Sequence, residues 1–197
     1  MIPKILHTTL HEHPPENTKY FWETVLRHTT GWDHRIHQDP RDPKVWDMTS
    51  KYWNLCKNGA TRANLVRLEA LYKFGGIYLD SDIELIRPID DLLNLNCFSV
   101  YLKKNHNRLA NGVMGSIPEH PAIKIALEVL IETLQTNYIP PIGPSSLTKA
   151  WLGRTDVTRV DSDAFYPYLW TEMHRRNEDF SKNPNTYGVH HWNAAWN

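Results

Sequence analysis

Hydrophobic residues along the chain form short apolar runs that alternate with stretches of helical periodicity, and this alternation predicts an α/β fold. A short apolar run at residues 2–6 is typical of a buried strand, and the apolar spacing between positions 20 and 26 is typical of an amphipathic helix. A second short strand is expected at residues 35–37, and a further helix at residues 45–55. The chain therefore opens with a β-α-β alternation.

The clearest element of the first half is a helix predicted at residues 61–74, which the pair Gly75-Gly76 ends. The β-branched and aromatic run at residues 77–79 is too short for a helix and predicts a strand. This strand would deliver Asp80 at its carboxyl end. In open α/β sheets, ligands bind outside the carboxyl ends of the strands, so Asp80 is a candidate functional residue.

The second half combines shorter elements with one long helix. We expect extended backbone at residues 83–86, a short helix at 90–93, strands at 98–102 and 113–116, a helix that begins at Pro121, and a short helix capped by Ser145 that runs to residue 152. The long helix carries apolar residues at helical spacing as far as Leu134 and is expected to be core. Periodicity is weak beyond Asp156. Neither an internal repeat nor a linker is evident, which predicts one domain over residues 1–197.

Composition narrows the classes of function. Hydrophobic residues make up 41% of the 197 residues, which is enough for the core of one domain. The 22 Lys and Arg residues balance the 22 Asp and Glu residues, so the formal net charge is zero. No general positive field exists that would attract nucleic acid. An anionic ligand must therefore be bound by individual groups at its site rather than by an overall positive charge of the protein.

Cysteine content and hydropathy bear on the compartment. Cys56 and Cys97 are too few for a disulfide scaffold, and we expect both to be reduced packing residues. The N-terminal apolar run is too short for a signal peptide, and no stretch approaches the roughly 20 apolar residues that span a bilayer. We expect a cytoplasmic protein without a transmembrane segment, and peripheral contact with a membrane stays open.

Three acidic residues alternate directly after the predicted strand. On an extended backbone the carboxylates of Asp80, Asp82 and Glu84 would project to one face. A divalent cation would relieve the repulsion within a buried cluster of like charges, and oxygen ligands favour Mg²⁺ or Mn²⁺ over Zn²⁺. The alternative is a solvated edge strand whose acids pair with Arg67 and Arg87 at the surface. The motif alone also permits a metal-dependent phosphohydrolase.

Four segments, in order along the chain, resemble one family of glycosyltransferases. These segments are the opening strand at residues 2–7, the central run at residues 67–84 with the Asp80-Ser81-Asp82 motif and its continuation at 87–90, the Gly143-Pro144 loop, and the closing segment at 189–193 with Trp196. They are similar to the glycosyltransferases with a sugar-binding region containing a DXD motif, a family 32-like group that is related to initiating mannosyltransferases and, more distantly, to clostridial glucosylating toxins.

The resemblance implies a fold and an activity. The implied fold is GT-A, a single Rossmann-like α/β/α sandwich that binds a nucleotide. The implied reaction is the retaining transfer of a hexose from a nucleoside-diphosphate donor, a UDP- or GDP-hexose, to a glycan or other hydroxyl acceptor, with Mn²⁺ or Mg²⁺ held by the DXD motif. The alternatives are a catalytically weak module that binds nucleotide sugars or glycans, and a metal-dependent phosphohydrolase.

The resemblance also implies roles for individual residues. It implies catalytic roles for Asp80, Asp82 and Asn111, a metal site of Asp80, Asp82 and His190, and donor-binding roles for His7, Thr8, Asn64, Arg67, Gly76, Tyr78, Asp80 and Trp196. The chain carries Asn64 where the family usually has Asp, which keeps a hydrogen-bond acceptor without the charge. Leu10 and Ala195 replace a frequent Trp and a frequent Ser.

Several of these residues also have purely structural interpretations. The alternatives are a packed core position for His190, an ion pair with Glu69 or with an acid of the cluster for Arg67, a tight turn at Asn111-Gly112, and an anchor of the C-terminus for Trp196. His191 is expected to face away from His190 if this segment is extended, because consecutive side chains of a strand point to opposite faces.

Overall fold

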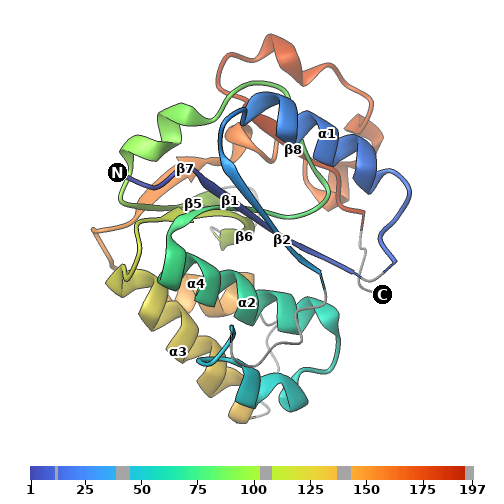
Figure 1. Cartoon of the computed structure of the whole chain (residues 1–197). Helices are drawn as coiled ribbons and strands as arrows, with labels where there is room; N and C mark the ends of the chain where they lie inside the picture. Colours follow the sequence, from blue (N-terminus) through green and yellow to red (C-terminus); the bar gives the residue numbers. More distant parts are fainter. Residues whose placement is uncertain (12, 39–44, 103–107, 137–142, 194–197) are drawn as a thin grey trace.

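A six-stranded sheet forms the centre of the molecule (Figure 1). The structure is a computed structural model that describes residues 1–11, 13–38, 45–102, 108–136 and 143–193. In spatial order the strands are β2 (Asp33–Gln38), β1 (Ile5–Leu10), β3 (Gly76–Leu79), β6 (Arg108–Ser116), β5 (Cys97–Leu102) and β7 (Thr158–Asp161). Strand β6 runs antiparallel to both of its neighbours, whereas the pairs β1–β2, β1–β3 and β5–β7 are parallel.

Two layers cover the two faces of the sheet (Figure 1). One layer holds the long helices α2 (Gly59–Phe74), α3 (Pro121–Gln135) and α4 (Pro144–Ala150), with the 3₁₀ helix η1 (Ser50–Leu55) beside α3. The other layer holds α1 (Thr18–His28), a small sheet of β4 (Ile83–Leu85) and β8 (Gly188–His190), and the 3₁₀ helices η2 (Asp90–Asn94), η3 (Ser162–Ala164), η4 (Trp170–Arg175) and η5 (Phe180–Lys182). The predicted α/β/α sandwich is confirmed.

Strand β3 lies between the two larger hydrophobic clusters of the described core. Ile77 and Leu79 pack into the cluster on the α1 side, and Tyr78 between them packs into the cluster under α2 and α3. This alternation follows from the two-residue period of a strand. All four residues of β3 are buried, so the residue that follows the strand emerges from the centre of the molecule.

Two glycines allow β3 to start directly after α2. Gly75 has φ +64° and Gly76 has φ +100°, a region that side chains with a Cβ rarely adopt. A Cβ on Gly76 would lie 2.4 Å from the carbonyl oxygen of Ile5 in the neighbouring strand. The glycine pair therefore ends the helix and brings β3 against β1 in one step, which fixes the position of Asp80.

Several sequence predictions of local structure need correction. The first strand begins at Ile5 rather than residue 2, because Pro3 has no N–H to donate to a ladder. Within residues 45–55 only Ser50–Leu55 is helical, and it is 3₁₀ rather than α. Helix α4 is preceded by Gly143 as N-cap residue, not by Ser145. Strands β7 and β8 were not predicted, because runs of four and three residues carry too little periodicity.

No helix within the described parts of the chain is long and apolar enough to cross a membrane.

Candidate active site

Asp80 and Asp82 lie on a tight turn that connects β3 to β4. Asp80 follows the carboxyl end of β3, and its backbone N–H donates a 2.8 Å hydrogen bond to the carbonyl of Gly112 in β6. The N–H of Ile83 then donates to the carbonyl of Asp80 at 3.1 Å, which closes the turn before β4 begins. The prediction that Asp80, Asp82 and Glu84 share one face is wrong for Glu84, which contacts His191 and Tyr20, whereas the turn brings Asp80 and Asp82 to the same cluster.

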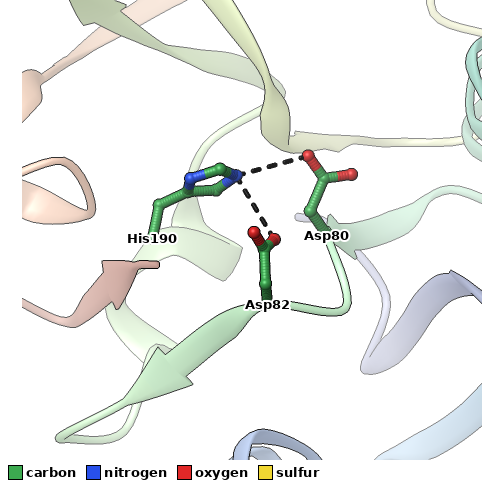
Figure 2. A group of neighbouring side chains, drawn as sticks. All are labelled: Asp80, Asp82 and His190. Carbon is green, nitrogen blue, oxygen red and sulfur yellow. Dashed lines mark ion pairs between the residues drawn. The ribbon is translucent and has the colours of Figure 1, made fainter. Parts of the chain in front are cut away.

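His190 joins the two aspartates from the far end of the sequence. It is the last residue of β8 and pairs with Ile83, the first residue of β4. Its Nε2 atom lies 3.4 Å from Oδ1 of Asp82 and 3.6 Å from Oδ2 of Asp80, and the three side chains point toward one another (Figure 2). One potential ligand atom from each residue lies within 4.8 Å of the others. The next histidine, His191, contacts Glu84 instead of this cluster, as expected from its position in the strand.

Arg67 is the buried counter-charge of the cluster. From helix α2 it donates hydrogen bonds of 2.6 Å to Oδ1 of Asp80 and to the carbonyl oxygen of Asn111, and one of 3.1 Å to the hydroxyl of Tyr78. Its guanidinium carbon lies 4.1 Å from the centre of the Tyr78 ring. Of the two ion pairs considered for Arg67, the one with an acid of the cluster is present, since Arg67 pairs with Asp80. The pairing with Glu69 is wrong, because Glu69 accepts hydrogen bonds from Thr49 and pairs with Lys73.

The charges of the cluster shift its pKa values in opposite directions. Burial alone would raise the pKa of Asp80, but Arg67 and His190 outweigh burial and lower this pKa to about 2. Burial disfavours the charged form of His190, yet the nearby Asp82 and Asp80 raise its pKa above the usual value. Asp80 is therefore ionised at neutral pH, and the cluster attracts positive charge.

The donor set of the cluster fits a divalent cation. Two carboxylates and one imidazole are ligands that Mn²⁺ and Mg²⁺ sites in proteins use, and no thiolate belongs to the group. Arg67 neutralises only Asp80, while Asp82 accepts one hydrogen bond of 2.8 Å from the backbone N–H of Asn193. The cluster thus retains negative charge that a cation would balance. These residues would hold the metal that the family resemblance implies.

The cluster lies in a cleft of about 370 Å³. The cleft is lined by Thr9, Ala60, Ala63, Asn64, Arg67, Asp80, Ser81, Asp82, Asn111, Pro144, Trp170, His190 and Trp192. A second hollow of about 210 Å³ adjoins it and adds Leu102, Arg108, Ala110, Gly112 and Tyr166 to the wall. The lining residues come from the carboxyl ends of β1, β3 and β5, from β6, from α2 and the start of α4, and from the C-terminal segment. The cleft therefore includes the strand ends where the sheet topology predicts a ligand.

The structure brings most of the predicted site residues together. Asn64, Arg67, Asp80, Asp82, Asn111 and His190 all line the cleft. The amide of Asn111 donates a 2.7 Å hydrogen bond to Oδ1 of Asn64, so these two side chains form one polar wall. Asn111 is part of strand β6, and the alternative of a tight turn at this position is wrong.

The other predicted donor-binding residues lie outside the lining. His7 and Thr8 are buried in β1, and their neighbour Thr9 lines the cleft. Gly76 and Tyr78 are buried in β3, where the hydroxyl of Tyr78 donates to Oδ1 of Asp80 at 3.0 Å. The donor-binding roles of these four residues stay predictions. Trp196 lies outside the described residues.

Two aromatic residues of the cleft, Tyr166 and Trp170, were not predicted, whereas Trp192 belongs to the closing segment that resembles the family. The ring of Tyr166 stacks on His190 with 5.1 Å between ring centres, and Trp192 contacts the same histidine edge-on at 4.3 Å. Trp170, 47% exposed, packs edge-on against Trp192 at the mouth of the cleft. The high density of aromatic residues at 165–170 is the feature of the sequence that could have indicated them. The weak periodicity of this segment predicts no helix or strand to which these residues could be assigned.

Comparison with solved structures identifies the fold. The glycosyltransferase GlyE of Streptococcus pneumoniae superposes with a TM-score of 0.64 at 14% identity, over 96% of this chain and 54% of the other. At this identity the likeness shows the fold alone. The fold is that of the GT-A glycosyltransferases, which is the class that the sequence predicted.

Comparison of sequences identifies the family. The family model "Glycosyltransferase sugar-binding region containing DXD motif" matches residues 9–99. An uncharacterized glycosyltransferase of Acanthamoeba polyphaga mimivirus is 30% identical over 191 residues, which is 85% of this chain and 74% of the relative. The human alpha-1,4-N-acetylglucosaminyltransferase is 28% identical over 145 residues, or 64% of this chain, and this match spans only 41% of the human protein. The chain belongs to the DXD-motif glycosyltransferase family.

Proposed function

We propose that residues 1–197 form one catalytic domain that transfers a hexose, with retention of configuration, from a UDP- or GDP-hexose to a hydroxyl group of a glycan or other acceptor. In this proposal Asp80, Asp82 and His190 hold Mn²⁺ or Mg²⁺. The observation that carries it is the convergence of these three side chains, with ligand atoms within 4.8 Å, in the wall of the cleft.

The chemistry of the transfer explains why a divalent cation is needed at the cluster. The bond between the anomeric carbon and the diphosphate oxygen breaks, the acceptor oxygen bonds to that carbon, and the proton of the acceptor hydroxyl passes to the departing diphosphate. Negative charge builds up on the leaving diphosphate, and a divalent cation bound at the cluster would stabilise this charge by several kcal/mol. Asp80 and Asp82 supply the negative potential that retains such a cation, and Arg67 fixes the orientation of Asp80.

The polar wall of the cleft suits recognition of the donor. Asn64 lies near the start of helix α2 and is hydrogen-bonded to Asn111, so both amides are held in a fixed orientation at the cleft. Amides both donate and accept hydrogen bonds, as recognition of sugar hydroxyl groups requires. We assign Asn64 and Asn111 to the donor sugar. Asn64 does so without the charge that Asp supplies in most of the family.

The acids of the cleft favour a front-face reaction. Among the described lining residues the only carboxylates are Asp80 and Asp82, and both belong to the proposed metal site. This leaves no separate carboxylate in that lining to act as a nucleophile. Retention is therefore best supported by attack of the acceptor on the same face from which the diphosphate departs.

The test is nucleotide release from a panel of UDP- and GDP-hexoses, with Mn²⁺ and with a chelator. We expect slow Mn²⁺-dependent hydrolysis in the wild type and a loss of roughly 1,000-fold in Asp82→Asn, equivalent to about 4 kcal/mol of stabilisation of the leaving group. The folded state of Asp82→Asn is checked by circular dichroism. Undiminished release by the variant would refute the metal site, and phosphate release from simple esters instead would indicate a phosphohydrolase.

A further inference from the structure

Glu84 is the third of the alternating acids, and it does not belong to the cluster of Asp80, Asp82 and His190. Its Oε2 atom lies 2.8 Å from Nε2 of His191, and its Oε1 atom accepts a 2.7 Å hydrogen bond from the hydroxyl of Tyr20 in helix α1. Phe21, the next residue of α1, stacks on the ring of His191 with 4.6 Å between ring centres and 17° between planes. Glu84 thus links β4, α1 and the residue next to the proposed ligand His190.

The ladder that holds His190 in place is very short. Strand β8 pairs with β4 through His190 with Ile83, Val189 with Glu84, and Gly188 with Leu85. A slip of one residue moves every side chain of a strand to its other face. Because His190 is followed directly by His191, a slip in one direction would bring His191 opposite Ile83, so a histidine would lie there in the observed and in the slipped register. The requirement for a histidine at the cluster therefore does not by itself decide how β8 is aligned with β4.

The backbone N–H of His190 donates a 2.9 Å hydrogen bond to the carbonyl of Phe165, and two features within β4 and the C-terminal segment further favour the observed register over the slipped one. In the observed register His191 lies diagonally across from Glu84 and contacts it, whereas after the slip Trp192 would occupy that diagonal position. Gly188 also fits closely, since a Cβ at this position would lie 2.6 Å from the carbonyl oxygen of Glu84. The slip would move Val189, which has a Cβ, toward that contact.

The register in turn orients the second aspartate. The backbone N–H of His191 donates to the carbonyl oxygen of Asp82 at 3.0 Å, and that of Asn193 donates to Oδ2 of Asp82 at 2.8 Å. The strand that carries His190 therefore also fixes the Asp82 carboxylate. Any shift of β8 would displace two of the three proposed metal ligands together.

We propose that the contact between Glu84 and His191 sets the register of β8 against β4 and thereby determines which of two consecutive histidines enters the metal site. Glu84 and His191 are positioning residues in this proposal. They touch neither the metal nor the substrate. The inference rests on the proposed metal-dependent function and adds to it the residues that assemble the site.

The test is the dissociation constant of Mn²⁺, measured from the free-ion signal in electron paramagnetic resonance. We expect Glu84→Ala to weaken Mn²⁺ binding roughly 10-fold, the typical effect of removing a partner of the ligand shell. Glu84→Gln keeps a group that can hydrogen-bond to His191 and should restore binding to near the wild-type value. Tyr20→Phe removes only the outer hydrogen bond and should weaken binding in the same direction by a smaller factor.

A matched control separates register from general stability. Leu130→Ala truncates a buried side chain of α3 in the core cluster on the opposite face of the sheet, so it should lower the melting temperature without changing the Mn²⁺ dissociation constant. If Glu84→Ala does not fold, Glu84→Asp takes its place, because the shorter side chain withdraws the carboxylate from His191.

The outcomes are distinct for the two proposals. Wild-type Mn²⁺ affinity in both Glu84→Ala and Glu84→Asp, or an equal loss in Leu130→Ala, would overturn the register proposal and leave the proposed function intact. No Mn²⁺ binding by the wild type would overturn the proposed function itself.

Discussion

The central segment around α2, β3 and β4 and the C-terminal segment from β7 to residue 193 contribute to the same site in contrasting ways. The central segment provides Asp80 and Asp82 from a buried strand end that the glycine pair after α2 fixes in place. The C-terminal segment provides His190 from a three-residue strand, which is held by a short backbone ladder with β4 and by a few side-chain contacts. A site can thus combine a rigid half, fixed by the core, with a half whose position depends on specific pairs.

The largest effect is expected from removing the counter-charge in the rigid half. Arg67→Met would leave the Asp80 carboxylate without its ion pair among buried side chains, and we expect a loss of about 3 kcal/mol in the free energy of unfolding, measured with urea. Arg67→Lys keeps the charge and should lose less. An Arg67→Met variant as stable as the wild type would contradict the view that this half is fixed by its buried charges.

This difference between the two segments also determined what the sequence could predict. The helix stripe, the Gly75-Gly76 terminator and the apolar run before Asp80 are local signals, so α2, β3 and the position of Asp80 were predictable. The placement of Glu84 could not be predicted in this way. The two-residue period of side chains holds only for extended backbone, and the turn at Ser81 interrupts the extended backbone.

The C-terminal segment was predicted only through family resemblance. His190 was predicted to be a ligand because residues 189–193 resemble the closing motif of the family. The strand that it pairs with lies 107 positions earlier and cannot be inferred from local periodicity. The aromatic residues Tyr166 and Trp170 were missed for the same reason. Their role depends on long-range contacts with His190 and Trp192, which no window of sequence contains.

A second effect concerns pH and involves two histidines of β1 and β2, the strands next to the rigid half in the sheet. His7 and His37 lie side by side, with 3.0 Å between ring nitrogens, and His7 lies 2.9 Å from the carbonyl oxygen of Gly75. Burial lowers the pKa of His7 to about 4 and that of His37 to about 3, from the usual value of 6.5. In the unfolded chain both bind protons below pH 6.5, whereas the folded state keeps them neutral.

Stability should therefore be complete above pH 6.5 and fall as the pH drops toward 4. For His7 alone the expected loss in the free energy of unfolding is about 3 kcal/mol, from the pKa shift at about 1.4 kcal/mol per unit. Denaturation curves at several pH values measure it. The double variant His7→Gln and His37→Gln should lose most of this pH dependence, and an unchanged slope in the variant would show that other groups cause it.

The smallest effect is expected at the exposed edge of the C-terminal half. Trp170 is half exposed at the mouth of the cleft, so Trp170→Ala should leave the melting temperature nearly unchanged. Loss of an aromatic surface for a sugar ring or base should raise KM roughly 5- to 10-fold, on the scale of an aromatic contact. Leu152→Ala, at an 80% exposed position outside the cleft, is the matched control. An unchanged KM in Trp170→Ala would remove this residue from the binding site.

The central claim is that one metal site unites the two segments, with His190 as the nitrogen ligand. Pulsed electron paramagnetic resonance of bound Mn²⁺ detects a directly coordinated imidazole nitrogen through its coupling to the electron spin. We predict this nitrogen coupling in the wild type and in the control His174→Gln, and its absence in His190→Ala. Persistence of the same coupling in His190→Ala would contradict the account.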